Sequence, residues 1–97
     1  MRFDIVLAPE AIEDLRVLPA ANRAKVKNAL EVHLRHEPAK VSRSRIKRLR
    51  GISRPQYRLR VEEIRVFYDI AERTVYVLAI VVKSEASSWL AKFGAPE

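Results

Sequence analysis

The sequence predicts an α+β protein in which an N-terminal strand and a helical hairpin pack on a mostly antiparallel four-stranded sheet, followed by a short C-terminal helix. Two observations support this prediction. Apolar residues recur at helical spacing in the first third of the chain and near its C-terminus, whereas residues 57–82 show strand-like alternation. The 97 residues contain no internal repeat, so we expect residues 1–97 to form a single domain.

The N-terminal elements follow from alternation and from two prolines. Apolar side chains alternate with other residues over 2–7, which predicts a first strand. Pro9 suits the first position of a helix whose opening turns are acidic, and Pro19 ends that helix. A second helix is expected from about Ala20 to about His36, because its apolar residues follow i, i+3, i+4 spacing. The link at Pro19 is so short that the two helices should form a hairpin.

The second half of the chain predicts three consecutive strands. Residues 38–54 are basic and lack periodicity, so we expect a loop or a poorly regular extension there. Strands are expected at 57–61, 64–70 and 74–82, and the links between them are short enough to require an antiparallel meander. The 74–82 segment is apolar on both faces, which predicts a central place in the sheet.

A short final helix is expected after the last strand. Ser84 can cap it, and Gly94 and Pro96 end it. The side chains expected to pack inward from this helix are Ala86, Trp89, Leu90 and Phe93.

Several classes of protein are excluded by composition. The chain has no cysteine, which removes disulfide scaffolds, thiolate nucleophiles and cysteine-ligated zinc. Its longest apolar run, Val75–Val82, is far shorter than the roughly 20 residues of a membrane span. Asp4 and Pro9 interrupt the region where a signal peptide would be apolar, so we expect a cytoplasmic protein with no membrane partner. His33 and His36 have no evident third ligand, and we expect neither a metal nor a small-molecule cofactor.

Positive charge is concentrated in one segment. The formal net charge is +7, and the window from Lys40 to Arg65 holds ten basic and only two acidic residues. Eight of the ten are arginine, whose guanidinium binds phosphate through paired hydrogen bonds. This concentration favours a site for a polyanion over the alternative, a solvated face that keeps a small protein soluble.

Four segments, in this order, resemble the RelE/ParE superfamily of type II toxins. They are a leucine–basic–glycine step at 49–51, a basic strand at 57–61, an arginine–apolar–apolar–tyrosine strand at 65–70 and an apolar strand at 75–80. The resemblance covers nearly the whole chain and includes the predicted order of strands and helices. It implies a RelE-like fold and a small basic toxin that is encoded together with an acidic antitoxin protein.

The superfamily contains two kinds of toxin. RelE-like members enter the ribosomal A site, beside 16S rRNA, and cut mRNA, whereas ParE-like members poison DNA gyrase without cutting RNA. The compact helical hairpin and the arginine-rich strands favour the RelE-like branch, and hence an endoribonuclease that inhibits translation. The alternatives are a ParE-like toxin and a catalytically degenerate member that binds RNA or an antitoxin.

Metal-independent cleavage requires attack of a 2′-hydroxyl on the adjacent phosphate, with positioned cations to stabilise the added negative charge. The resemblance places Arg58, Arg60 and Arg65 at the family's basic positions. We expect Arg65 to clamp the scissile phosphate, and Arg58 and Arg60 to hold the backbone and stabilise the transition state. Lys83 matches a position that is often arginine, and a lysine among three guanidiniums would have a lowered pKa suited to proton transfer. The alternative for Lys83 is an exposed lysine at the end of a strand.

Further residues are expected to contact RNA. Trp89 stands where RelE-like nucleases usually carry a tyrosine or histidine that assists catalysis. An indole can stack on a base, but it cannot transfer a proton at neutral pH. The alternative for Trp89 is an apolar anchor for the last helix. The basic residues expected to bind the RNA backbone are Lys47, Arg48, Arg50 and Arg54.

Overall fold

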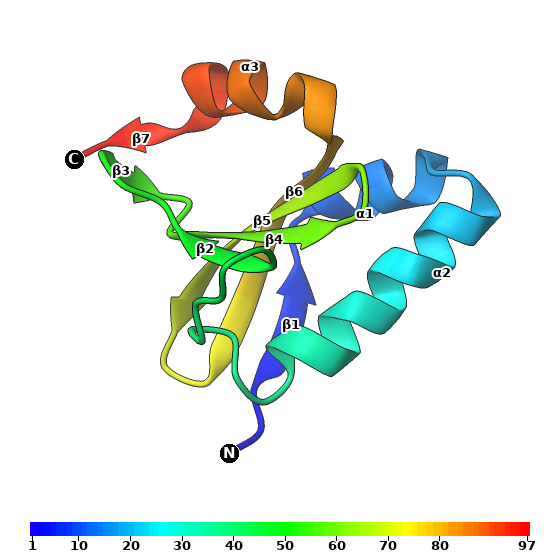
Figure 1. The fold of residues 1–97 in the computed structure, drawn as a ribbon, viewed down its shortest axis with the longest axis horizontal. Helices are drawn as coiled ribbons and strands as arrows, with labels where there is room; N and C mark the ends of the chain where they lie inside the picture. Colours follow the sequence, from blue (N-terminus) through cyan, green and yellow to red (C-terminus); the bar gives the residue numbers. More distant parts are fainter.

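The computed structural model describes residues 1–97 and contains three α-helices and seven strands (Figure 1). The elements in chain order are β1 (Asp4–Leu7), α1 (Pro9–Val17), α2 (Ala20–Ala29), the π-helical turn η1 (Leu30–Leu34), β2 (Ile46–Arg48), β3 (Ile52–Arg54), β4 (Tyr57–Val61), β5 (Ile64–Ala71), β6 (Thr74–Val82), α3 (Lys83–Phe93) and β7 (Ala95–Pro96). The predicted α+β class is confirmed, and the predicted elements occur in the predicted order, with β2, β3 and β7 in addition.

The main sheet has five strands in the spatial order β1–β6–β5–β4–β2. Strands β4, β5 and β6 form the predicted antiparallel meander, and β1 pairs with β6 in parallel. β6 therefore has a neighbour on each side, as its two apolar faces predicted, although the middle position belongs to β5.

The prediction of four strands and of an irregular segment at 38–54 is wrong. This segment contributes β2, which pairs with β4 at the edge of the main sheet, and β3, which pairs with β7 in a second, two-stranded sheet. Each of these two strands has three residues, too few for alternation to be recognised. Their partners lie elsewhere in the chain, so local sequence carries no signal for the pairing.

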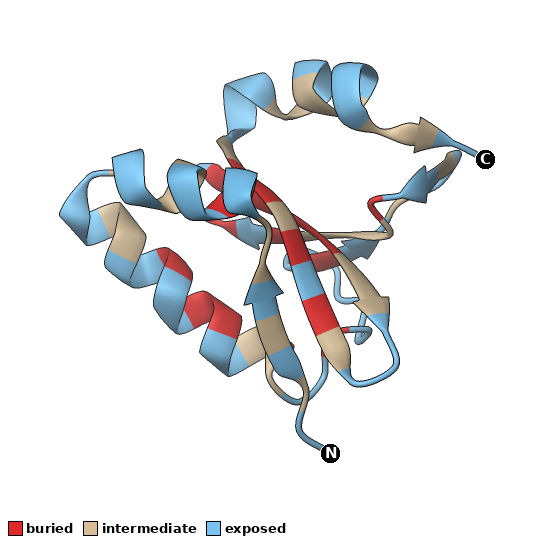
Figure 2. Cartoon of the chain, turned by 180° about the vertical axis from the view of Figure 1, so that it is seen from behind, coloured by how far each residue is buried: buried red, intermediate tan, exposed pale blue.

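Helices α1 and α2 form the predicted hairpin. The helical path continues from α2 through η1 to Leu34, close to the predicted end of the second helix. Figure 2 shows buried residues along α2 and on the interior strands of the sheet. The fully or nearly buried core residues contributed by the helices are Ala11, Val26, Ala29, Leu30 and Leu34. No helix of the protein is both long and apolar enough to cross a membrane.

Tyr68 of β5 lies at the centre of this core. Its side chain is fully buried, its ring stacks on Tyr57 with centroids 5.5 Å apart, and its hydroxyl donates a hydrogen bond of 2.7 Å to the carbonyl of Pro38. Burial raises the pKa of the Tyr68 hydroxyl well above its usual value, so the group remains a donor. This bond fastens the chain after η1 to the sheet, ahead of β2.

Asp14 completes the hydrogen bonding of β6 beyond the end of β1. The last residue of β1 pairs with Val77, and further along the strand the amide of Ile80 donates to Asp14 Oδ2 at 3.0 Å. We expect Asp14→Ala to lower the free energy of unfolding by about 1–3 kcal/mol, because a part-buried amide loses its acceptor. Urea denaturation measures this loss, and Asp14→Asn, which keeps an acceptor oxygen, should recover most of it. Equal losses in both variants would contradict the assignment.

His33 of η1 is half-buried, as its position on the apolar face of the helix predicted. Burial, and then the charge of Arg45, lower the pKa of His33 below its usual value of 6.5. The folded state therefore binds fewer protons at this ring than the unfolded state does. We expect a contribution to stability that is present above pH 6.5 and is lost as the pH falls through the lowered pKa of the folded state. Denaturant midpoints between pH 8 and 5 test this, and His33→Gln should remove that part of the pH dependence.

Helix α3 lies on the face of the sheet opposite α1 and α2 (Figure 1). The predicted cap at Ser84 is wrong, because the helix starts directly from β6 after Val82 and Ser84 falls within its first turn. The amide of Lys83 instead donates to the carbonyl of Glu63 at 2.7 Å. No residue of α3 is fully buried, and Phe93, which was expected to pack inward, is 59% exposed.

Candidate functional site

Three arginines meet on the sheet face that carries α3. Arg60 of β4 lies directly opposite Arg65 of β5 in the antiparallel register, and Arg58 lies two residues before Arg60. Side chains two residues apart on a strand, and those directly opposite across a strand pair, point to the same face. We call Arg58, Arg60 and Arg65 the arginine trio.

No carboxylate forms a salt bridge with any member of the trio. Burial, followed by the charges of Arg65 and Arg60, lowers the pKa of Arg58. The Nε of Arg58 is buried and has no hydrogen-bond partner. Like charges directly opposite each other destabilise a sheet, so this arrangement carries a cost that a bound anion would relieve.

Arg65 and Arg60 differ in how firmly they are held. Arg65 is 6% exposed, and its Nη1 donates to the carbonyls of Glu62 at 2.7 Å and Ile64 at 3.1 Å. These bonds fix its guanidinium beside the turn between β4 and β5. The side chain of Arg60 is exposed and makes no hydrogen bond within the protein, so it is free to bind a ligand in solution.

Two lysines extend the positive charge. Lys47 of β2 is the register partner of Arg58, which places it on the same face, one strand nearer the sheet edge. Lys83 lies on the other side of the trio, at the start of α3. Its backbone amide donates a hydrogen bond to the carbonyl of Glu63, in the turn next to Arg65. The side chain of Lys83 is exposed and forms no ion pair with Glu85 or any other carboxylate.

Other arginines from the basic segment stand apart from the trio. Arg48 is the register partner of Tyr57 on the opposite face, where its guanidinium lies 5.2 Å from the Tyr57 ring centroid. Arg50 is exposed in the connection between β2 and β3. Arg54 lies in β3 and forms an ion pair of 3.2 Å with Asp69, which partly neutralises it.

Trp89 fastens α3 to the sheet beside the trio. Its indole stacks on Phe67, with ring centroids 5.0 Å apart and planes inclined by 5°. Phe93 contacts the same indole in a tilted arrangement at 5.5 Å. Phe67 is fully buried and is the register partner of Arg58. The anchoring role was the alternative considered for Trp89, and the stack on Phe67 provides that anchor.

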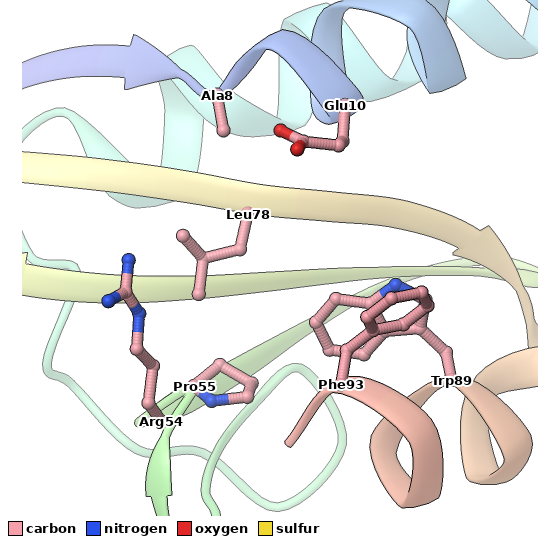
Figure 3. A pocket seen from close by; sticks show the side chains of 7 residues that line it. All are labelled: Ala8, Glu10, Arg54, Pro55, Leu78, Trp89 and Phe93. Atoms are coloured by element: carbon pink, nitrogen blue, oxygen red, sulfur yellow. The ribbon is translucent and has the colours of Figure 1, made fainter. Parts of the chain in front are cut away.

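A cavity of about 260 Å³ opens next to Trp89 (Figure 3). It lies between the start of α1, the middle of β6, the end of β3 and helix α3. Its lining residues are Ala8, Glu10, Arg54, Pro55, Leu78, Trp89 and Phe93. Sequence reasoning did not connect these residues, because they come from four separate parts of the chain. Phe67 lies below Trp89 and does not line the cavity. Its place on the same strand face as Arg65 could be predicted from alternation. Nowhere does the fold gather three or more side chains of the kinds that ligate metals.

Several solved structures of bacterial and archaeal toxins share this arrangement of strands and helices. The RelE–RelB complex from Pyrococcus horikoshii OT3 has a TM-score of 0.70 at 20% identity, covering 86% of this chain and 97% of that chain. The toxin–antitoxin complex RelBE2 from Mycobacterium tuberculosis has a TM-score of 0.70 at 25% identity, covering 84% and 99% respectively. A mutant of the E. coli toxin RelE in the free state has a TM-score of 0.69 at 23% identity, covering 94% and 93%.

The protein therefore has the fold of RelE-like type II toxins, and the resemblance seen in the sequence motifs is confirmed at this level. No protein-family model matches the sequence, and no curated protein matches it either. The likeness is thus one of three-dimensional structure, carried by few identical residues.

Proposed function

We propose that this protein is the toxin of a type II toxin–antitoxin module and acts as a ribosome-dependent mRNA endonuclease. The observation that carries the proposal is the arginine trio, three guanidiniums on one sheet face, none of which forms a salt bridge with a carboxylate. The RelE-like fold supports the same function, because solved structures that share it are toxins, several of them in complex with antitoxins.

Cleavage proceeds by attack of a ribose 2′-oxygen on the adjacent phosphorus. A bond forms between these two atoms, the bond to the 5′-oxygen breaks, and the products are a 2′,3′-cyclic phosphate and a free 5′-hydroxyl. The phosphate gains negative charge as the 2′-oxygen attacks. Arg65, already held by two carbonyls, clamps that phosphate, while Arg58 and Arg60 bind the backbone and stabilise the added charge.

The 2′-hydroxyl must lose a proton and the 5′-oxygen must gain one. Arginine is a poor base, and the indole of Trp89 does not exchange a proton at neutral pH. We assign to Lys83 the donation of a proton to the departing 5′-oxygen, because its exposed amino group has no ion-pair partner and it starts α3 beside the turn that holds Arg65. A group of the ribosome accepts the proton that leaves the 2′-hydroxyl.

The proposed partners are an acidic antitoxin protein, and mRNA on the ribosome next to 16S rRNA. Several of the similar structures are complexes of toxins with antitoxins, namely RelB and YefM. An acidic antitoxin segment is complementary to the excess charge of this chain, which totals +7. Lys47 extends the RNA-binding surface beyond the trio, and Arg50 and Arg54 contribute at its rim. Arg48 lies on the opposite face of the sheet against Tyr57, so it is left out of this surface. Action on ribosomes places the protein in the cytoplasm.

A second candidate is a family member that binds RNA or antitoxin without cutting. The packing of Trp89 against Phe67 and Phe93 favours it, because an aromatic anchor occupies the place of a proton-transferring residue. Gyrase inhibition of the ParE type is the outcome to consider if RNA is neither cut nor bound.

Primer extension on a reporter mRNA translated by purified ribosomes tests the proposal. Wild type is compared with Trp89→Tyr, and with Arg73→Ala as a control that removes an exposed arginine from the distant turn between β5 and β6. Cuts at A-site codons by wild type and Arg73→Ala support the nuclease. Cuts by Trp89→Tyr alone indicate that the chemistry has decayed at this position. Intact message throughout overturns the proposal, and a DNA supercoiling assay with gyrase then follows.

A further inference from the structure

We infer that the cavity beside Trp89 is a nucleobase pocket selective for guanine. The pocket would decide which base lies next to the phosphate that the arginine trio binds. The inference rests on the proposed action on RNA. The cavity is formed by residues of α1, β3 and β6 as well as α3, so it is distinct from the trio itself (Figure 3).

The size and lining of the cavity suit one planar ring system. Its volume of about 260 Å³ lies just below the roughly 300–1,000 Å³ of sites for drug-sized ligands. Its apolar walls are the rings of Trp89, Phe93 and Pro55 and the side chain of Leu78. Aromatic walls stack on the π-face of any base, so they provide affinity without choosing among bases.

Selectivity comes from the two charged residues of the lining. Glu10 carries only acceptors and Arg54 only donors, and Figure 3 shows them on opposite sides of the cavity. Guanine alone offers two adjacent donors on one edge, N1–H and the N2 amino group, and two acceptors, O6 and N7, on another. A carboxylate binds the first pair and a guanidinium the second. The ion pair with Asp69 at 3.2 Å restrains Arg54 in this position.

The cavity is close enough to the trio for one RNA strand to occupy both. Trp89, a wall of the cavity, stacks on Phe67 at 5.0 Å, and Phe67 is the register partner of Arg58. One stacked pair of rings, Trp89 and Phe67, therefore connects the wall of the cavity to the position beside Arg58. The sugar-phosphate backbone of a base in the cavity then runs over the arginines.

Trp89 is the only tryptophan in the chain, so its fluorescence reports directly on the cavity. We would titrate the protein with GMP, AMP, CMP and UMP, whose phosphate contributes equally to all four. We expect GMP to bind roughly tenfold more tightly than UMP, within the range that a bidentate base contact provides. Glu10→Gln should remove this preference, and Arg54→Gln should weaken it. Glu13→Gln, the same charge change one turn along α1, should leave it unchanged.

Equal binding of the four nucleotides, or a preference that Glu10→Gln does not alter, would contradict the inference that the cavity selects guanine. The ribosome assay separates this failure from failure of the proposed function. If mRNA is cleaved without any dependence on guanine, and Glu10→Gln cleaves it in the same way, the inferred guanine pocket is contradicted and the proposed nuclease activity is supported. If the protein prefers GMP, loses this preference in Glu10→Gln and yet cuts no mRNA, the guanine pocket is supported and the proposed nuclease activity is contradicted.

Discussion

Arg60→Ala is expected to slow mRNA cleavage roughly 10²–10³-fold. The side chain of Arg60 is exposed and makes no hydrogen bond within the protein, and the residue lies directly opposite Arg65, so its guanidinium is available to the reacting phosphate. Loss of one preorganised donor costs about 2.7–4 kcal/mol of transition-state stabilisation in comparable sites. The rate of appearance of the cleaved product in the ribosome assay measures this effect.

The same substitution should leave the fold intact. Removing one of two opposed like charges relieves repulsion, so the unfolding free energy of Arg60→Ala should equal or slightly exceed that of wild type at low salt. Arg73→Ala serves as the matched control in both measurements, and its cleavage rate should match wild type. A slow Arg60→Ala variant that is also strongly destabilised would show that Arg60 acts through the fold and would contradict its assignment to the phosphate.

Tyr68→Ala should lower the free energy of unfolding by about 3–5 kcal/mol, the usual range for truncating a large buried aromatic side chain. The ring is fully buried, stacks on Tyr57 and donates to the carbonyl of Pro38. A loss of this size is a large part of the roughly 5–15 kcal/mol that stabilises a typical domain. Urea denaturation followed by circular dichroism provides the measurement.

Tyr68→Phe separates the hydroxyl from the ring. It keeps the stack on Tyr57 and removes only the bond to Pro38, so we expect it to cost about 1–3 kcal/mol. A cost as large as that of Tyr68→Ala would mean that fastening the chain after η1, and not the packing of the ring, is the main contribution of Tyr68.

Much of the fold could be predicted because its signals are local. Alternation over residues 57–82 identified three strands and the face that each side chain occupies, since the side-chain period of a strand is two. That is also why Arg58 and Arg60 could be assigned to one face before their neighbours were known. Prolines marked where α1 begins and where it gives way to α2, because proline restricts the backbone on both sides.

The rest could not be predicted because it depends on partners distant in sequence. β2 and β3 have three residues each, and they exist as strands only because β4 and β7 offer them hydrogen bonds. In the sequence Asp14 is indistinguishable from an ordinary surface acid. Its role as acceptor for the amide of Ile80 depends on where α1 lies against β6. Likewise, Arg48 belongs to the basic segment by sequence, yet its pairing with Tyr57 turns it to the face away from the trio.

The sequence by itself thus determined the class of fold, the order of its main elements and the segment that carries the positive charge. These properties follow from periodicity and composition, which each stretch of chain carries alone. Only the tertiary structure decided that Arg65 opposes Arg60, that Trp89 rests on Phe67, and that Glu10 and Arg54 share a cavity. Register, stacking and cavities arise between elements, because they depend on how separate surfaces fit together in space.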